Sequence, residues 1–204
     1  MKTLAACSTL ALTMLALAPQ SVAAQATVPT WREIVVYASD ATYPRALAQR
    51  GVQGDVTIEL TPGAPGRKAA ATVRDSSRSA DLDALALGMA RRLEIAATQG
   101  PASGLVMFRF RKDHLTSLAT KSCADFNVDA AYQSATFPER SLRELPVFYE
   151  SIGKLVYSFH REGESRAFPP VDAILDAAVA GCARTPQAGM LDVMRQEALK
   201  LIAP

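Results

Sequence analysis

The hydrophobic pattern of the chain changes once, at His114, and the two sides of that point predict different kinds of structure. Before His114, apolar residues alternate with polar ones, most clearly over 55–60 and 105–111. Alternation is typical of a strand with one buried face. After His114 no alternating stretch appears, and apolar residues recur at spacings of three or four, as they do in helices. The sequence therefore predicts a part that contains a sheet, followed by an all-helical part.

The first part has the expected order helix, strand, strand, helix, strand. Proline suits a first helical turn and glycine suits a helix end, so Pro44 and Gly51 bound a short helix. The Pro- and Gly-rich loop 61–66 then joins two strands in a hairpin, the second over 68–75. Ser79 is the expected N-cap of a second helix. A further short strand is indicated by the apolar residues within 31–37.

The second part is expected to follow a linker, residues 115–121, and to hold four helices. Helical spacing places them at about 122–135, 141–160, 170–182 and 187–202. Pro146 lies inside the second of these segments, where it either kinks the helix or marks its true start.

The first residues indicate export. A basic start at Lys2, an apolar run and the small residues 22–24 are typical of a secretory signal peptide cut after Ala24, or alternatively after Ala26. Two alternatives remain, an uncleaved anchor and a lipid anchor at Cys7, although the lipoprotein-like box precedes the apolar run. We expect a soluble periplasmic protein whose formal charge falls from +2 to +1 when Lys2 is removed. Such a small charge gives no drive toward nucleic acid.

Two cysteines remain once Cys7 has left with the signal peptide. In an oxidising compartment Cys123 and Cys182 allow one intramolecular pairing, so we expect a disulfide between them. The alternative is one buried thiol and one free thiol.

Catalytic motifs are missing from the sequence. His114 and His160 have no companion at metal-ligand spacing, and there is no Gly-x-Ser-x-Gly elbow, phosphate loop or dinucleotide fingerprint. Paired basic residues such as Arg111-Lys112 are expected on solvated faces. We therefore expect a non-catalytic protein with no cofactor, no metal and no small-molecule substrate. An enzyme would need a convergent polar pocket that the sequence does not show.

One stretch carries a family resemblance. The segment "YPRALAQRGVQGDVTIELTP", a Gly-bearing hairpin, "ATVRDSS", "LDALALGMARRL" and "GLVMFRF" together resemble the TonB C-terminal domain over roughly residues 40–112. The resemblance implies that fold and a tendency to bind an extended segment of an envelope or outer-membrane protein, with a link to TonB-dependent transport as one possibility. The chain departs from the family at Leu93, where an aromatic residue usually follows the paired arginines. It also lacks the inner-membrane anchor and the Pro-rich spacer, so the resemblance does not by itself imply energy transduction.

A fainter resemblance concerns the helical part. "SCADF" at 122–126 and "CARTP" at 182–186 are similar to HdeA-type periplasmic acid-stress chaperones, in which two cysteines close a small helical fold. This resemblance implies an alternative function as a stress chaperone. Any small helical module with one disulfide would give the same pattern.

These observations combine into an expected α+β organisation. Residues 1–24 are a signal peptide, and residues 28–114 form a TonB C-terminal-like domain with a three-stranded antiparallel sheet and two helices. Residues 115–121 are a linker, and residues 122–204 form a helical domain closed by one disulfide.

The candidate site is a peptide-binding edge. The last strand of the expected sheet, 105–111, has nothing after it to cover it, and an uncovered edge is a template for strand addition. Its polar face would favour an acidic partner, although the same charges would also serve to protect an edge. Tyr43 and Pro44 form a turn that either starts the helix or touches the peptide. The residues expected to bind peptide are Tyr43, Pro44, Met107, Arg109 and Arg111.

Overall fold

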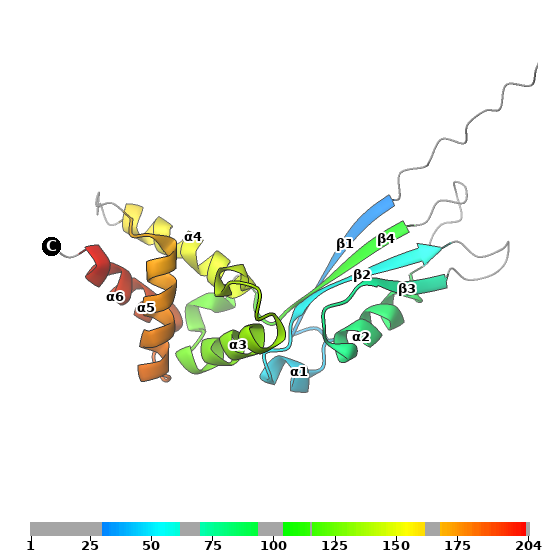
Figure 1. Ribbon diagram of the computed structural model, residues 1–204, viewed down its shortest axis with the longest axis horizontal. Coiled ribbons are helices and arrows are strands. Elements are labelled where there is room, and N and C mark those ends of the chain that lie inside the picture. The colour runs from blue at the N-terminus through cyan, green and yellow to red at the C-terminus, as the bar shows by residue number, and fades with distance from the viewer. Residues whose placement is uncertain (1–29, 62–69, 94–103, 115, 162–167, 203–204) are drawn as a thin grey trace, which may run out of the picture.

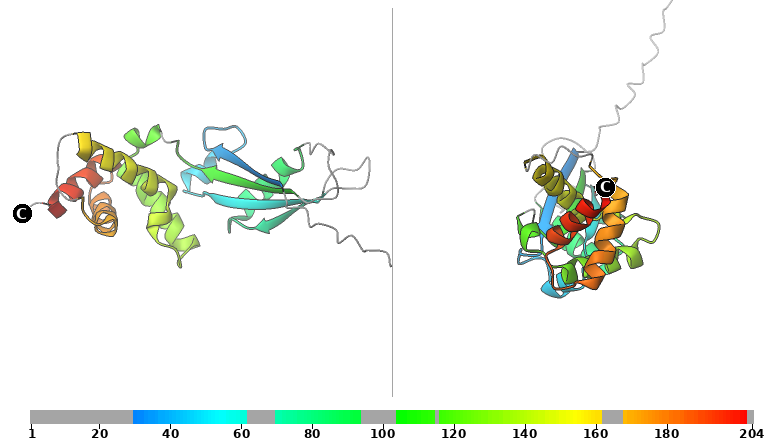
Figure 2. Two further views of the ribbon diagram at one scale, coloured as in Figure 1. Left: turned by 90° about the horizontal axis from the view of Figure 1, so that it is seen from above. Right: turned by 90° about the vertical axis from the view of Figure 1, so that its left-hand side faces the viewer.

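The computed structural model describes residues 30–61, 70–93, 104–114, 116–161 and 168–202. The described residues form a sheet with two α-helices and then four further α-helices. The sheet and the later helices follow one another along the long axis of the molecule (Figures 1 and 2). The expected signal peptide and, except for Thr61, the expected hairpin loop 61–66 lie outside the described residues. No described helix is long and apolar enough to cross a membrane.

Three strands follow the predicted alternation. β2 (Gly54–Thr61) pairs antiparallel with β3 (Ala70–Asp75) and, on its other side, antiparallel with β4 (Gly104–Arg111). Their alternate apolar side chains face the two helices of this part, because residues two apart on a strand share a face. The buried sheet residues are Val56, Ile58, Leu60, Val106, Phe108 and Phe110.

A fourth strand corrects the expected sheet. β1 (Thr30–Tyr37) pairs in parallel with β4, from Thr30 opposite Gly104 to Tyr37 opposite Arg111. The sheet is therefore mixed and four-stranded, with the order β1-β4-β2-β3. The expectation of a three-stranded antiparallel sheet with 105–111 at its edge is wrong. The apolar residues within 31–37 predicted a strand there but could not say which neighbour it would choose, because the side-chain pattern of a strand does not specify its partner or its direction.

Two helices cover one face of this sheet (Figure 1). α1 (Arg45–Gln49) follows Pro44, as predicted, and ends near Gly51, whose φ of +73° is readily accessible to glycine. α2 (Ala80–Ala90) begins after Ser79, whose hydroxyl accepts a hydrogen bond from the Leu82 amide. The apolar sides of both helices bury Leu47, Leu82 and Ala86 against the sheet.

The helical part has a core of its own. A short 3-10 turn (η1, Ser117–Thr120) leads to α3 (Cys123–Thr136), and a second turn (η2, Leu142–Glu144) leads to α4 (Pro146–Arg161). Pro146 therefore marks the start of its helix and does not kink it. α5 (Val171–Arg184) and α6 (Met190–Ile202) complete a core that includes Phe126, Phe148, Ile174 and Met194.

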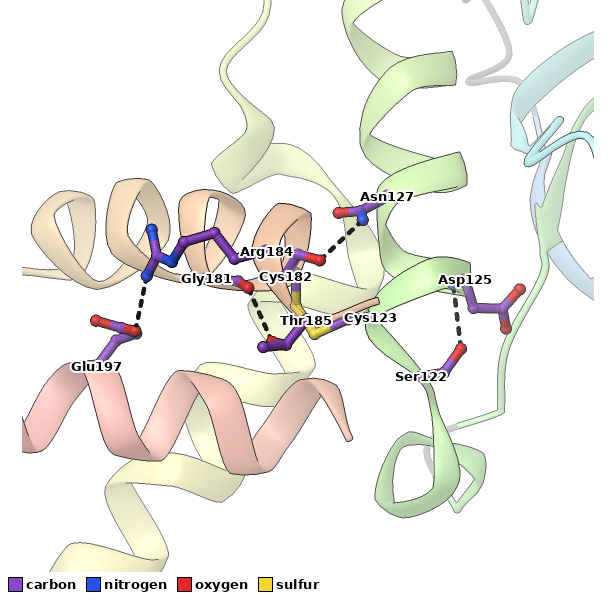
Figure 3. Close-up of a disulfide and its surroundings, with 9 residues drawn as sticks. All are labelled: Ser122, Cys123, Asp125, Asn127, Gly181, Cys182, Arg184, Thr185 and Glu197. Atoms are coloured by element: carbon purple, nitrogen blue, oxygen red, sulfur yellow. Dashed lines mark hydrogen bonds and ion pairs between the residues drawn. A yellow bond between two sulfur atoms is a disulfide. The ribbon is translucent and has the colours of Figure 1, made fainter. Parts of the chain in front are cut away.

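The expected disulfide is present (Figure 3). Cys123, the first residue of α3, is bonded to Cys182 in the last turns of α5, and both are fully buried. Nearby, the Asn127 side-chain amide donates a hydrogen bond of 3.1 Å to the Cys182 carbonyl. Arg184 pairs with Glu197 of α6 at 3.2 Å. The bond thus ties together α3 and α5 at a point where α6 also lies close.

Candidate functional site

The outer edge of β1 bears backbone groups that no other described strand pairs. The Ala38 amide donates to the Arg111 carbonyl at 3.0 Å, so the even-numbered residues of β1 direct their backbone groups toward β4. The odd-numbered residues, Glu33 and Val35 among them, therefore direct theirs away from the sheet. At the end of this edge the Tyr37 amide is satisfied by the Asp40 carboxylate at 2.8 Å.

The face of the sheet opposite α1 and α2 carries charges of both signs near this edge. The Arg109 guanidinium lies 3.4 Å from the Glu33 carboxylate on β1 and 3.9 Å from the Asp55 carboxylate on β2. Arg111 pairs with Asp55 at 2.6 Å. Arg109 is thus shared between acids of two different strands, and one of these strands is β1.

The predicted site residues divide between two faces. Met107, Arg109 and Arg111 lie together on this open face of β4. Their backbone groups face β1, because they are odd-numbered residues of β4 and the Arg111 carbonyl accepts from Ala38. The strand expected to be added beside 105–111 therefore finds that position taken by β1.

Tyr43 and Pro44 lie on the helix-covered face. The Tyr43 ring is only 3 % exposed and packs edge-on against Phe110, and its hydroxyl donates to the Val52 carbonyl. Burial, followed by the neighbouring Tyr132 and Asp129, raises the pKa of this phenol. Pro44 is exposed beside a shallow groove between α1 and α2. The structure therefore does not bring these two residues to the open face with Met107, Arg109 and Arg111.

A second charged group lies where the sheet meets the helices, and sequence reasoning missed it. We call it the junction cluster; it consists of Lys112, Asp113, Lys121, Asp125 and Asp129. The Lys121 ammonium lies 2.7 Å from both Asp113 and Asp129, and its side chain is 1 % exposed. The Lys112 ammonium lies 2.8 Å from Asp129, whose carboxylate is fully buried. Lys121, Asp125 and Asp129 recur at a spacing of four, the one signal in the sequence that indicates such pairs.

Burial and charge oppose each other in this cluster. Burial disfavours the Lys121 ammonium, but the carboxylates of Asp129 and Asp113 outweigh that effect and raise its pKa. Burial raises the pKa of Asp129 against the opposing effect of both lysines. Burial also acts to raise the pKa of Asp125, but its hydrogen bond with Lys112 and the charge of Lys121 prevail and lower it. The cluster therefore holds Lys121 in its charged form. The expectation that Arg111-Lys112 marks a solvated face is wrong, since the side chain of Lys112 is 8 % exposed.

A cleft of about 440 Å³ opens where the open face of the sheet meets the end of α3. The sheet contributes Thr57, Met107 and Arg111, and the helical part contributes Gln133, Phe137 and Arg140. Arg78, from the loop before α2, reaches across to Glu139 at 2.5 Å. The two parts therefore meet in a polar, interlocked contact.

Metal chemistry finds no support in the described part of the chain, where no group of three or more His, Cys, Asp or Glu side chains could hold an ion. His114 stacks on Tyr37 with the ring centroids 3.6 Å apart and hydrogen bonds with Ser39 at 2.8 Å. The side chain of His160 lies outside the described residues.

The fold and its edge together define an α+β module: a mixed sheet with helices on one face and an uncovered strand at one side. Residues 39–111 match the family model of the Gram-negative bacterial TonB protein C-terminal domain, which confirms the resemblance inferred from the sequence. The match covers slightly over a third of the 204 residues. Domains of this family are periplasmic protein-interaction modules. Comparison of the chain with curated proteins and with solved structures finds no match. The similarity of the helical part to HdeA-type chaperones stays a prediction.

Proposed function

We propose that this chain is a non-catalytic periplasmic binding module that takes up an extended segment of an envelope or outer-membrane protein as an added strand. The segment enters on the β1 side of the sheet. The match of residues 39–111 to a family of periplasmic interaction domains supports the class of function.

The observation that carries the proposal is the difference between the two sides of the sheet. β1 offers an edge of eight residues, and its pairing with β4 has no register shift over that length. On the other side β3 is six residues long, and its pairing with β2 shifts register between Thr57 and Ile58. Shifts of this kind are bulges, which twist an edge away from further pairing. The β1 side is therefore the better template.

The charges of the open face favour a segment with acidic residues. Arg109, half-exposed, lies next to the β1 edge, and Arg111 lies further along the same face. An acidic residue on the added segment would find Arg109 within reach. Met107 lies between these arginines and the far end of the strand and offers an apolar contact. Tyr43 and Pro44 contribute indirectly, from the helix-covered face of the sheet, by fixing the start of α1.

The test is capture from a periplasmic and outer-membrane extract with the mature chain as bait. Few specific partners are expected, and TonB-dependent receptors among them would connect the chain to transport. Binding of a captured partner's extended segment should then shift amide resonances along β1 and β4. Amide shifts confined to β3 or to α3–α6 would contradict the proposed site.

The helical part supports a second candidate, a chaperone for unfolded periplasmic proteins. α4 exposes the side chains of Tyr149 and Tyr157, which are 78 % and 68 % exposed. Contiguous exposed apolar patches mark protein-interaction sites, and in this proposal the two tyrosines form part of such a patch for apolar segments of unfolded chains. In this case the same capture experiment would recover many clients, more of them at acidic pH, and replacing both tyrosines by serine would abolish that recovery.

A further inference from the structure

β1 lies outside the segment that matches the TonB C-terminal domain. The match begins at residue 39, two residues after β1 ends. Within the matched segment the strand order is β4-β2-β3, so β4 would form the edge of its sheet. In this chain β1 covers that edge (Figure 1).

β1 pairs with β4 along its whole length, but few of its described side chains are buried against the sheet. Among the side chains of β1 that the structure describes, those of residues 32–37, Val36 alone is buried, at 2 % exposure, and Ile34 is partly buried beside it. On the other face Val35 is 40 % exposed, and Glu33 makes a half-exposed ion pair with Arg109. Exposed ion pairs stabilise little. An edge strand that buries little apolar surface is among the parts of a fold that open first.

Among the described residues, the side-chain contacts of β1 gather at its C-terminal end. There Tyr37 stacks on His114, Ser39 hydrogen bonds with His114, and the Ala38 amide donates to the Arg111 carbonyl. At the other end Thr30 has Gly104 as its register partner, a residue without a side chain. Opening of β1 therefore starts at Thr30 and proceeds toward Tyr37.

We infer that β1 is a displaceable strand that occupies the peptide-accepting edge of β4, and that the partner segment replaces it. This inference rests on the proposed function and makes β4, exposed when β1 leaves, the accepting strand in place of the outer edge of β1. The displaced position defines the chemistry of the partner. The partner segment runs parallel to β4 and carries apolar residues where Ile34 and Val36 lie. It carries an acidic residue where Glu33 lies, because departure of Glu33 leaves Arg109 without its partner on that side.

Competition by β1 has a measurable consequence. The apparent affinity of a ligand is its intrinsic affinity multiplied by the fraction of molecules whose site is open. Any change that releases β1 should therefore tighten binding, although the contacts between the partner and β4 stay the same.

Two neighbouring proline substitutions distinguish exchange, in which the partner segment replaces β1, from addition, in which it pairs with the outer edge of β1. The Ile34 amide points toward β4, so Ile34→Pro removes a bond of the β1-β4 ladder and releases the strand. The Val35 amide points away from the sheet, so Val35→Pro leaves that ladder intact and blocks only a strand added outside β1. The probe is a fluorescein-labelled peptide with the β1 sequence TWREIVVY, titrated by anisotropy into the full mature chain.

Under exchange, Ile34→Pro should bind the probe at least tenfold more tightly than the wild type, and Val35→Pro should change affinity less than twofold. A probe with arginine in place of its glutamate should bind more weakly, and Arg109→Glu should restore its affinity. If Ile34→Pro fails to fold by circular dichroism, Glu33→Arg provides the same release through repulsion from Arg109, and it should tighten binding severalfold.

Loss of binding in Val35→Pro without tightening in Ile34→Pro or Glu33→Arg would overturn exchange, but it would leave strand addition on the β1 side standing. If no variant binds the probe while the wild type still captures envelope partners on that side, exchange alone is refuted. If partners are absent as well, the proposed function fails too. A doubled mass of Ile34→Pro by light scattering would identify a second copy as the occupant and would refute an envelope segment in that role.

Discussion

Replacing Lys121 by methionine should destabilise the protein by about 3 kcal/mol. Lys121 is 1 % exposed and lies 2.7 Å from both Asp113 and Asp129. At that distance and an effective dielectric constant of about 20, each contact is worth roughly 6 kcal/mol before desolvation. Desolvation of the ammonium opposes several kcal/mol of this gain. Methionine keeps an unbranched side chain that is one atom shorter, so the change chiefly removes the charge.

The remaining charges limit the loss. Without Lys121, the carboxylates of Asp113, Asp125 and Asp129 keep one ammonium, that of Lys112, which contacts the latter two. Asp129 then stays fully buried with a single cationic partner. Breaking a buried pair by removal of one member typically destabilises a protein by about 3–5 kcal/mol, and the partner that remains places the expectation at the lower end.

Urea unfolding followed by circular dichroism measures this effect, because urea is uncharged and does not screen ion pairs. The matched control is Arg143→Met, which removes an exposed contact of 3.2 Å with Asp172 and should change stability by less than about 1 kcal/mol. Adding Asp129→Leu to Lys121→Met should restore much of the loss, since it removes a carboxylate left with too few partners. A loss no larger than the control, or no recovery in the double variant, would refute the view that these groups act as one buried unit.

Three further predictions follow from single features. Because the folded state raises the pKa of Lys121 above its ordinary value of 10.5, its contribution is complete below that pH and is lost as pH rises through the folded pKa; pH-dependent urea unfolding should show a steeper alkaline decline in the wild type than in Lys121→Met, which keeps the decline caused by the buried Tyr43 phenol. Cys182→Ala should lower stability by about 4 kcal/mol in the loop-entropy model, since the disulfide spans 59 residues, and hydrogen exchange should show the loss in α3 and α5 and not in β2. Gly51→Ala should destabilise by at least about 1 kcal/mol in thermal unfolding, because φ is +73° there and the added methyl carbon would lie 2.9 Å from the Val128 carbonyl oxygen, whereas Gly153→Ala, which meets open space in a helix, should be neutral or stabilising.

Local patterns were sufficient to predict the elements of this fold. The alternation of Val56, Ile58 and Leu60 gave the buried face of β2, and Ser79 was correctly placed as the N-cap of α2. The helical ranges agreed with α3 to α6 within a few residues, since each depends on neighbours three or four positions away. The cysteine pair was predictable because only one pairing was available.

Long-range neighbours were beyond that reasoning. β1 and β4 are separated by most of the N-terminal part, and neither contains a residue whose type specifies the other as its partner. The junction cluster was missed for a related reason. From the sequence alone, a lysine in an apparent linker is expected to be exposed to solvent. Lys121 is buried only because folding brings Asp113 and Asp129 around its ammonium. The predicted arginines did lie together on one face, but the position beside them was already filled.

The parallel pairing of β1 with β4 also decides how the molecule responds to tension. The start of β1 lies at the end of the sheet that is farther from α3–α6, and the end of α6 lies at the opposite end of the molecule (Figure 1). A pull between these points draws β1 by its N-terminal end and β4 by its C-terminal end, in opposite directions along the strands. The ladder bonds lie across that direction, so they are loaded together in shear and must break at once. A ligand that enters at Thr30 breaks them one at a time. The same strand is therefore strong against a lengthwise pull and weak against a competitor that peels it away.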